Sequence, residues 1–132
     1  METSPVRILV VEDFEPFRIL IRAILEKNPR LRIVAEVSDG LDAVQKAADL
    51  KPDLIFLDIG LPMLNGLDAA RLIRKLAPES RILFISQELS PEVVHEALAL
   101  GAFGYVVKTK LGSELLNAVE AVLLGKNFVS GK

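Results

Sequence analysis

Five short apolar runs, each followed by a segment with helical periodicity, restrict the fold of this chain more than any other feature. The runs are RILVV (7–11), RIVAEV (32–37), LIFLD (54–58), RILFIS (81–86) and GYVVK (104–108). Their starts lie roughly 22 to 27 residues apart, about the length of one strand and one crossover helix. This alternation predicts an α/β fold in which helices cover both faces of a doubly wound, five-stranded parallel sheet, (βα)5.

The helical segments carry apolar stripes and boundary signals. Ser90, Pro91 and Glu92 predict a helix start, and Asp39 predicts a weaker one. Gly101 and Gly125 suit helix ends that need a positive φ. We expect three apolar stripes to pack in the core: Phe17, Leu20, Ile21, Ile24 and Leu25; Leu67, Ala70, Ile73 and Leu76; and Leu115, Leu116, Val119, Val122 and Leu123.

Length and charge limit the classes of function. The 132 residues are enough for one domain, which we expect to span residues 1–125, with residues 126–132 as a tail or the start of a linker. A net charge of -2 gives no reason to expect binding to DNA or to an anionic membrane. The chain has no cysteine, and no apolar run is long enough for a signal peptide or a membrane span. We therefore expect a cytoplasmic domain.

Polar residues stand where the apolar runs end. Glu12 and Asp13 follow the first run, Asp58 ends the third, Ser86 the fourth and Lys108 the fifth. In open α/β sheets, ligands bind beyond the carboxyl ends of the strands, where the strand order reverses. With the flavodoxin-like order 2-1-3-4-5, this point lies between the first and third strands. The three carboxylates are then expected to meet in one crevice.

Three carboxylates in one crevice require compensating positive charge. Two unit charges about 5 Å apart repel by roughly 3 kcal/mol at an effective dielectric constant near 20. Lys108 and a divalent cation would offset this repulsion, and oxygen ligands without a nearby histidine or cysteine favour Mg²⁺. Such an ion usually leaves room for a phosphate oxygen, and carboxylates serve as covalent acceptors in phosphoryl transfer. Asp58 is therefore the expected phosphoryl acceptor, with Lys108 and the Ser86 hydroxyl as partners of the phosphoryl oxygens.

The order and spacing of these motifs resemble a known family. The acidic pair, DIGLPMLNG (58–66), Ser86 and GAFGYVVK (101–108) are similar to a CheY-like receiver domain of two-component response regulators, over about residues 6–124. The ending AVEAVLLGKNFVS (118–130) is most similar to the LuxR/NarL-type subfamily, whose receivers usually precede a helix-turn-helix domain. Glu12 in place of aspartate, Ser86 in place of threonine and Thr109 in place of proline depart from the commonest pattern.

The resemblance implies a function and a role for each residue. A sensor histidine kinase would phosphorylate Asp58, and Asp13, Asp58 and the backbone carbonyl of Gly60 would bind Mg²⁺, with Glu12 acting through water. Ser86 and Tyr105 would form a switch that changes the surface of the fourth helix, fifth strand and fifth helix and so controls an output partner in transcription. The resemblance also implies a homodimer through the first and fifth helices. The domain itself is then a regulatory phosphoacceptor rather than an enzyme, although self-catalysed phosphorylation and dephosphorylation are compatible with it.

Two alternative functions remain open. An aspartyl-phosphate phosphatase of the haloacid dehalogenase type requires a second acid two residues after the nucleophile, where this chain has Gly60. A pseudo-receiver would keep the fold as a protein-interaction module, but the intact set of acidic residues, serine and lysine argues against it. Flavin or nucleotide binding is disfavoured because the chain has neither GxGxxG nor GxxxxGK. Among the separate residues, Asp13 could instead cap the following helix, and Tyr105 could be an ordinary core aromatic.

Overall fold

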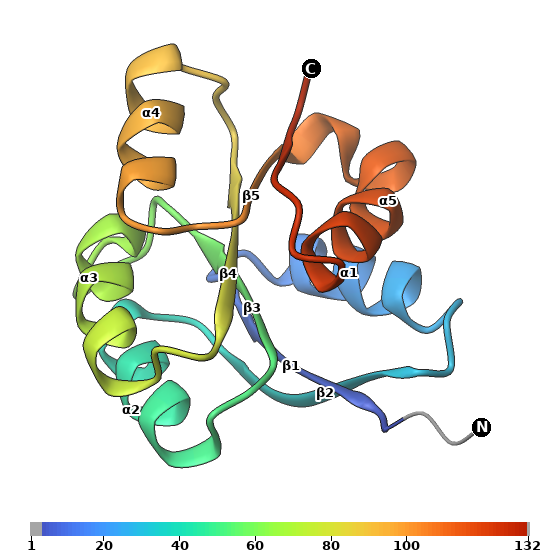
Figure 1. Ribbon diagram of the computed structural model, residues 1–132, viewed down its shortest axis with the longest axis horizontal. Helices are drawn as coiled ribbons and strands as arrows, with labels where there is room; N and C mark the ends of the chain where they lie inside the picture. Colours follow the sequence, from blue (N-terminus) through green and yellow to red (C-terminus); the bar gives the residue numbers. More distant parts are fainter. Residues whose placement is uncertain (1–3, 132) are drawn as a thin grey trace.

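A parallel sheet forms the middle layer of the computed structural model, which describes residues 4–131 (Figure 1). Its strand order is β2-β1-β3-β4-β5-β6, which confirms the predicted doubly wound fold and the order 2-1-3-4-5. The strands are β1 (Val6–Val11), β2 (Leu31–Val37), β3 (Leu54–Asp58), β4 (Arg81–Ser86), β5 (Gly104–Val107) and β6 (Phe128–Val129). The helices are α1 (Glu15–Leu25), α2 (Gly40–Leu50), α3 (Gly66–Leu76), α4 (Pro91–Ala99) and α5 (Leu111–Leu123), with a short 3-10 helix, η1 (Lys108–Lys110).

Alternating residues of the central strands separate the core into two parts. Ile8, Val10 and Phe56 face α1 and α5, whereas Leu9 and Leu57 face α2, α3 and α4. Figure 1 shows α1 and α5 together on one side of the sheet. Because β1, β3 and β4 are buried on both faces, they appear in the sequence as continuous apolar runs rather than as alternating ones.

Most of the predicted helix boundaries are confirmed. Asp39 Oδ1 accepts a hydrogen bond of 2.8 Å from the Asp42 N–H, and Ser90 is the N-cap of α4. Gly101 and Gly125 follow α4 and α5 with φ of 98° and 82°. No helix within residues 4–131 is long and apolar enough to cross a membrane.

Three local expectations differ from the structure. Leu20 in the middle of α1 and Leu76 at the end of α3 are exposed, so the prediction that these two stripe residues pack in the core is wrong. Lys108 opens η1 instead of ending β5, because the backbone turns into a 3-10 helix directly after Val107. Residues 126–132 were expected to be a tail or linker, but within this segment Phe128 and Val129 form β6 on the edge of β5.

Candidate functional site

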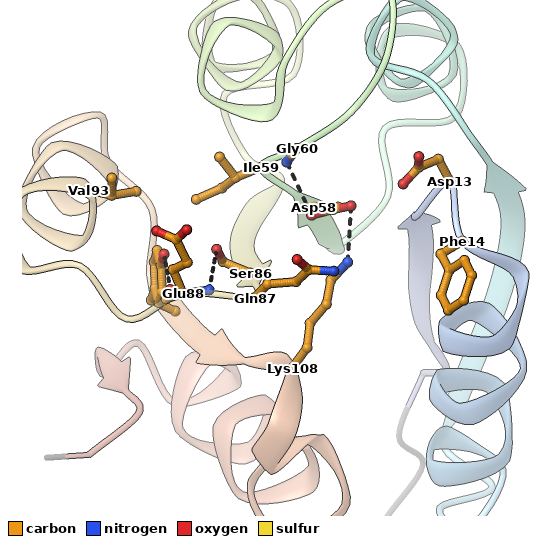
Figure 2. Close-up of a pocket in the computed structure, with 11 residues that line it drawn as sticks. Asp13, Phe14, Asp58, Ile59, Gly60, Ser86, Gln87, Glu88, Val93 and Lys108 are labelled. Carbon is orange, nitrogen blue, oxygen red and sulfur yellow. Dashed lines mark hydrogen bonds and ion pairs between the residues drawn. The ribbon is translucent and has the colours of Figure 1, made fainter.

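The register of the sheet brings the predicted site residues to one end of it. Val11 pairs with Leu57, so Glu12, directly after β1, and Asp58, the last residue of β3, lie side by side. Ser86 pairs with Val107, which places Lys108 directly beyond that pair. These strand ends surround a cavity of roughly 510 Å³ (Figure 2). Its lining comprises Asp13, Phe14, Asp58, Ile59, Gly60, Ser86, Gln87, Glu88, Val93, Tyr105 and Lys108.

Lys108 connects two buried carboxylates. Its Nζ lies 3.1 Å from Asp58 Oδ2, to which it donates a hydrogen bond, and 2.8 Å from Glu12 Oε1. The contact with Glu12 is a close ion pair between two buried side chains. Since the Lys108 side chain is only 4% exposed, its charge depends on these partners rather than on solvent.

Glu12 is fixed by the first residues of α1 and the loop before it. Its Oε2 accepts a hydrogen bond of 3.0 Å from the Phe14 N–H, and its backbone carbonyl accepts one of 2.7 Å from Arg18. Burial raises the pKa of the Glu12 carboxyl above its ordinary value, and Lys108 offsets that effect only in part. The acidic pair is therefore divided: Glu12 is buried against Lys108, whereas Asp13 is exposed at the mouth of the cavity. Phe14, not Asp13, is the N-cap residue of α1.

Asp58 is held at the floor of the cavity by the loop after β3. Its Oδ1 accepts a hydrogen bond of 3.2 Å from the Gly60 N–H (Figure 2). The loop returns at once to the strand end, where the Gly66 N–H donates to the Ile59 carbonyl at 2.8 Å. A Cβ on residue 66 would lie 2.2 Å from the Asp58 carbonyl oxygen, so this close approach requires glycine.

The acidic residues fit a divalent cation. One carboxylate oxygen from each of Glu12, Asp13 and Asp58 lies within 4.8 Å of the others. All of these ligand atoms are oxygens, the type that Mg²⁺ prefers. The three carboxylates are therefore close enough together to hold one ion.

Ser86 and Tyr105 both contact Glu88 on the other side of the cavity. Ser86 Oγ accepts a hydrogen bond of 3.2 Å from the Glu88 N–H, and the Tyr105 hydroxyl donates one of 2.8 Å to the Glu88 carbonyl. The Tyr105 ring is fully buried, and burial raises the pKa of its hydroxyl. The ring thus already occupies an inward position in this structure.

Several residues of the site were not identified from the sequence. Phe17 was assigned only to an apolar stripe, yet its ring centroid lies 4.7 Å from Lys108 Nζ. Phe14, Gln87 and Glu88 line the cavity because they directly follow strand-end residues that were identified. That position beyond a strand end was the available signal for these three, whereas no sequence signal distinguished Phe17 from its apolar neighbours.

The sequence profile of the response regulator receiver domain matches residues 8–120. The chain belongs to this family. This receiver is similar to the crystal structure of a LuxR-family two-component response regulator from Aurantimonas sp. SI85-9A1, with a TM-score of 0.91, 33% identity and coverage of 97% of this chain and 91% of that one. It is also similar to the receiver domain of the putative response regulator NarL from Mycobacterium tuberculosis, with a TM-score of 0.87, 29% identity and coverage of 94% and 100%.

The curated relatives are longer than this receiver. A protein-glutamate methylesterase/protein-glutamine glutaminase of Thermotoga maritima is 40% identical over 110 residues, which cover 82% of this chain and 32% of that protein. The transcriptional regulatory protein LiaR of Bacillus subtilis is 28% identical over 127 residues, which cover 96% of this chain and 60% of that protein. The chain thus spans about a third to three fifths of these two relatives.

Proposed function

We propose that this receiver accepts a phosphoryl group on Asp58 from a sensor histidine kinase in a reaction that requires Mg²⁺. The observation that carries the proposal is the position of the Asp58 carboxylate, on the floor of an open cavity with a buried ammonium 3.1 Å away. An attacking carboxylate and a fixed positive charge at this distance suit a reaction that brings negatively charged oxygens into the cavity.

In the proposed reaction, one Asp58 oxygen forms a bond to phosphorus as the N–P bond of the donor phosphohistidine breaks. The electron pair of that bond remains on the imidazole nitrogen, and Asp58 becomes an acyl phosphate. Lys108 turns from the carboxylates toward a phosphoryl oxygen and balances its charge. When bound, Mg²⁺ would neutralise the remaining phosphoryl charge; we assign it to Asp13, Asp58 and the carbonyl of Gly60, with Glu12 acting through water.

The proposed switch connects Ser86 to Tyr105 through Glu88. If the Ser86 hydroxyl turns to a phosphoryl oxygen, the Glu88 N–H loses its present acceptor. The loop then shifts, and the Tyr105 hydroxyl, which is bonded to the Glu88 carbonyl, shifts with it. Helix α4 follows this loop and has only one buried residue, Ala97, so little packing resists its movement. The surface of α4, β5 and α5 would thus report phosphorylation to a partner.

We assign the control of transcription, rather than catalysis, as the output. The similarity to the LuxR-family regulator covers nearly the whole of both chains, whereas the methylesterase similarity covers a third of that enzyme. In this proposal the receiver contacts a kinase and an output domain or downstream protein, and it does not itself bind DNA. We also propose that the receiver is cytoplasmic and has no membrane partner.

Labelling with acetyl phosphate and Mg²⁺ tests the proposal. Intact-mass measurement should show one phosphoryl group on the unaltered protein, none on Asp58→Asn and one on Asp49→Asn, a matched control at an exposed position of α2. Continuous turnover of acetyl phosphate by the unaltered protein would indicate a phosphatase, and no labelling would indicate a pseudo-receiver. With beryllofluoride and Mg²⁺, amide shifts should extend over residues 88–108; changes confined to the surroundings of Asp58 would contradict the switch.

A further inference from the structure

We propose that Phe17 is a positioning residue whose ring face holds the Lys108 ammonium in the cavity. This inference rests on the proposed function, because it concerns the lysine that balances the phosphoryl charge. It adds an aromatic ring to the groups that hold the Lys108 ammonium, beside the carboxylates of Glu12 and Asp58.

The contacts of Lys108 leave one side of its ammonium for the ring. An ammonium has three N–H donors, and this one donates a hydrogen bond to Asp58 and forms a buried ion pair with Glu12 at 2.8 Å. The ring centroid of Phe17 lies 4.7 Å from Nζ, within the roughly 6 Å over which an aromatic face attracts a cation. Because the side chain is almost completely buried, the ring takes the place of solvent on that side.

Helix α1 fixes the ring in place. Phe17 lies in the first turn of α1, where its N–H donates to the Phe14 carbonyl at 3.0 Å. The rings of Phe14 and Phe17 pack with their centroids 5.6 Å apart and their planes tilted by 59°. The neighbouring Arg18 holds the Glu12 carbonyl, so the same turn sets the position of both the ring and the carboxylate around Lys108.

A ring suits a lysine that must move during the reaction. A fourth carboxylate would hold the ammonium by directional bonds and add negative charge to three acidic groups already within 4.8 Å of one another. An aromatic face attracts the cation without net charge and tolerates a small displacement toward a phosphoryl oxygen. If the attraction is weakened, the buried ammonium becomes less favourable relative to conformations outside the cavity. Phosphorylation should then slow.

Fluorinated phenylalanines at position 17 test the charge of the ring face with little change in the shape of the ring. Fluorine withdraws charge from the ring face, so 4-fluoro- and 3,4,5-trifluorophenylalanine should weaken the attraction stepwise. The labelling rate with acetyl phosphate should fall with each step, by about three- to tenfold at the trifluoro ring. Phe103 is the matched control: its ring lies 5.1 Å from the Arg81 guanidinium carbon, next to the opposite end of β5, and the same substitutions there should leave the rate unchanged.

A second measurement does not depend on phosphorylation. The ε-methylene protons of Lys108 should show an upfield ring-current shift in the unaltered protein, which Phe17→Leu should abolish. Absence of that shift in the unaltered protein, or equal labelling rates across the fluorinated series at position 17, would overturn the inference. Failure of the unaltered protein to become labelled would instead overturn the proposed function, and the ring-current shift would still decide whether Phe17 holds Lys108.

Discussion

Glu12 and Asp13 are adjacent acids with opposite surroundings, and we expect them to contribute differently to metal binding. Asp13 is exposed at the mouth of the cavity, whereas Glu12 is buried against Lys108. Asp13→Ala should lower the Mg²⁺ affinity by on the order of tenfold or more, because it removes a direct ligand. It should also slow labelling and slightly raise the free energy of unfolding of the metal-free protein, because one repulsive charge is gone.

Calorimetric titration with Mg²⁺ and thermal unfolding without metal check this prediction. Glu12→Gln is the comparison: it should weaken Mg²⁺ binding less than Asp13→Ala does. In the metal-free protein, Glu12→Gln should lower the free energy of unfolding, whereas Asp13→Ala should raise it slightly, because Lys108 loses a buried ionic partner only in Glu12→Gln. An unchanged Mg²⁺ affinity in Asp13→Ala would remove Asp13 from the proposed ligand set.

The sequence predicts which residues gather in the site. It does not predict which of their side chains contact one another directly. Asp58, Ser86 and Lys108 were identifiable because the carboxyl ends of parallel strands gather at one edge of a sheet. The ion pair between Glu12 and Lys108 was not, because it depends on the rotation of side chains after the backbone is placed. The ring contact of Phe17 was missed for the same reason, since an apolar stripe does not reveal which of its members touches a charge.

Ser130, directly after β6, forms hydrogen bonds to β5 and α5. Its hydroxyl accepts a hydrogen bond of 2.9 Å from the Val107 N–H and donates one of 2.5 Å to Glu114 on α5. The residue is buried, so Ser130→Ala leaves a buried N–H and a carboxylate without these partners. We expect a loss of about 1–3 kcal/mol in the free energy of unfolding, measured by urea denaturation.

Ser113→Ala is the control for this prediction, because its exposed hydroxyl makes only a long bond, 3.3 Å, to the Lys110 carbonyl. Equal stabilities of the two variants would show that the Ser130 contacts contribute nothing. Strand β6 could not be predicted from the sequence. A strand of two residues has no periodicity to detect, and β6 exists only because β5 offers a free edge for pairing.

The molecule as a whole has exposed apolar side chains on the side of the sheet proposed for dimerisation. Ile19 on α1 and Leu124 directly after α5 are 51% and 73% exposed. We expect a symmetric homodimer through α1 and α5 that phosphorylation strengthens. Sedimentation velocity should show a larger species with beryllofluoride and Mg²⁺ than without them.

Ile19→Glu should prevent this association, because it places a charge in the proposed interface. Leu72→Glu on α3 is the matched control, since it charges an exposed leucine on the other side of the sheet and should leave association unchanged. A monomer in both states at high protein concentration would exclude the homodimer.

The short sixth strand also determines where the chain can be cut. The family match ends at residue 120, which makes the end of α5 a natural place to shorten the protein. Yet β6 and the residue after it satisfy backbone carbonyls along the β5 edge of the sheet. The Phe128 N–H donates to the Phe103 carbonyl, and the Ser130 N–H donates to the Tyr105 carbonyl. Shortening to the family boundary would leave these carbonyls on an open sheet edge, which is a template for pairing with another polypeptide. A truncated receiver would then associate through the unpaired backbone carbonyls of β5. Its oligomeric state would be a result of the truncation and would say nothing about how phosphorylation regulates the intact domain.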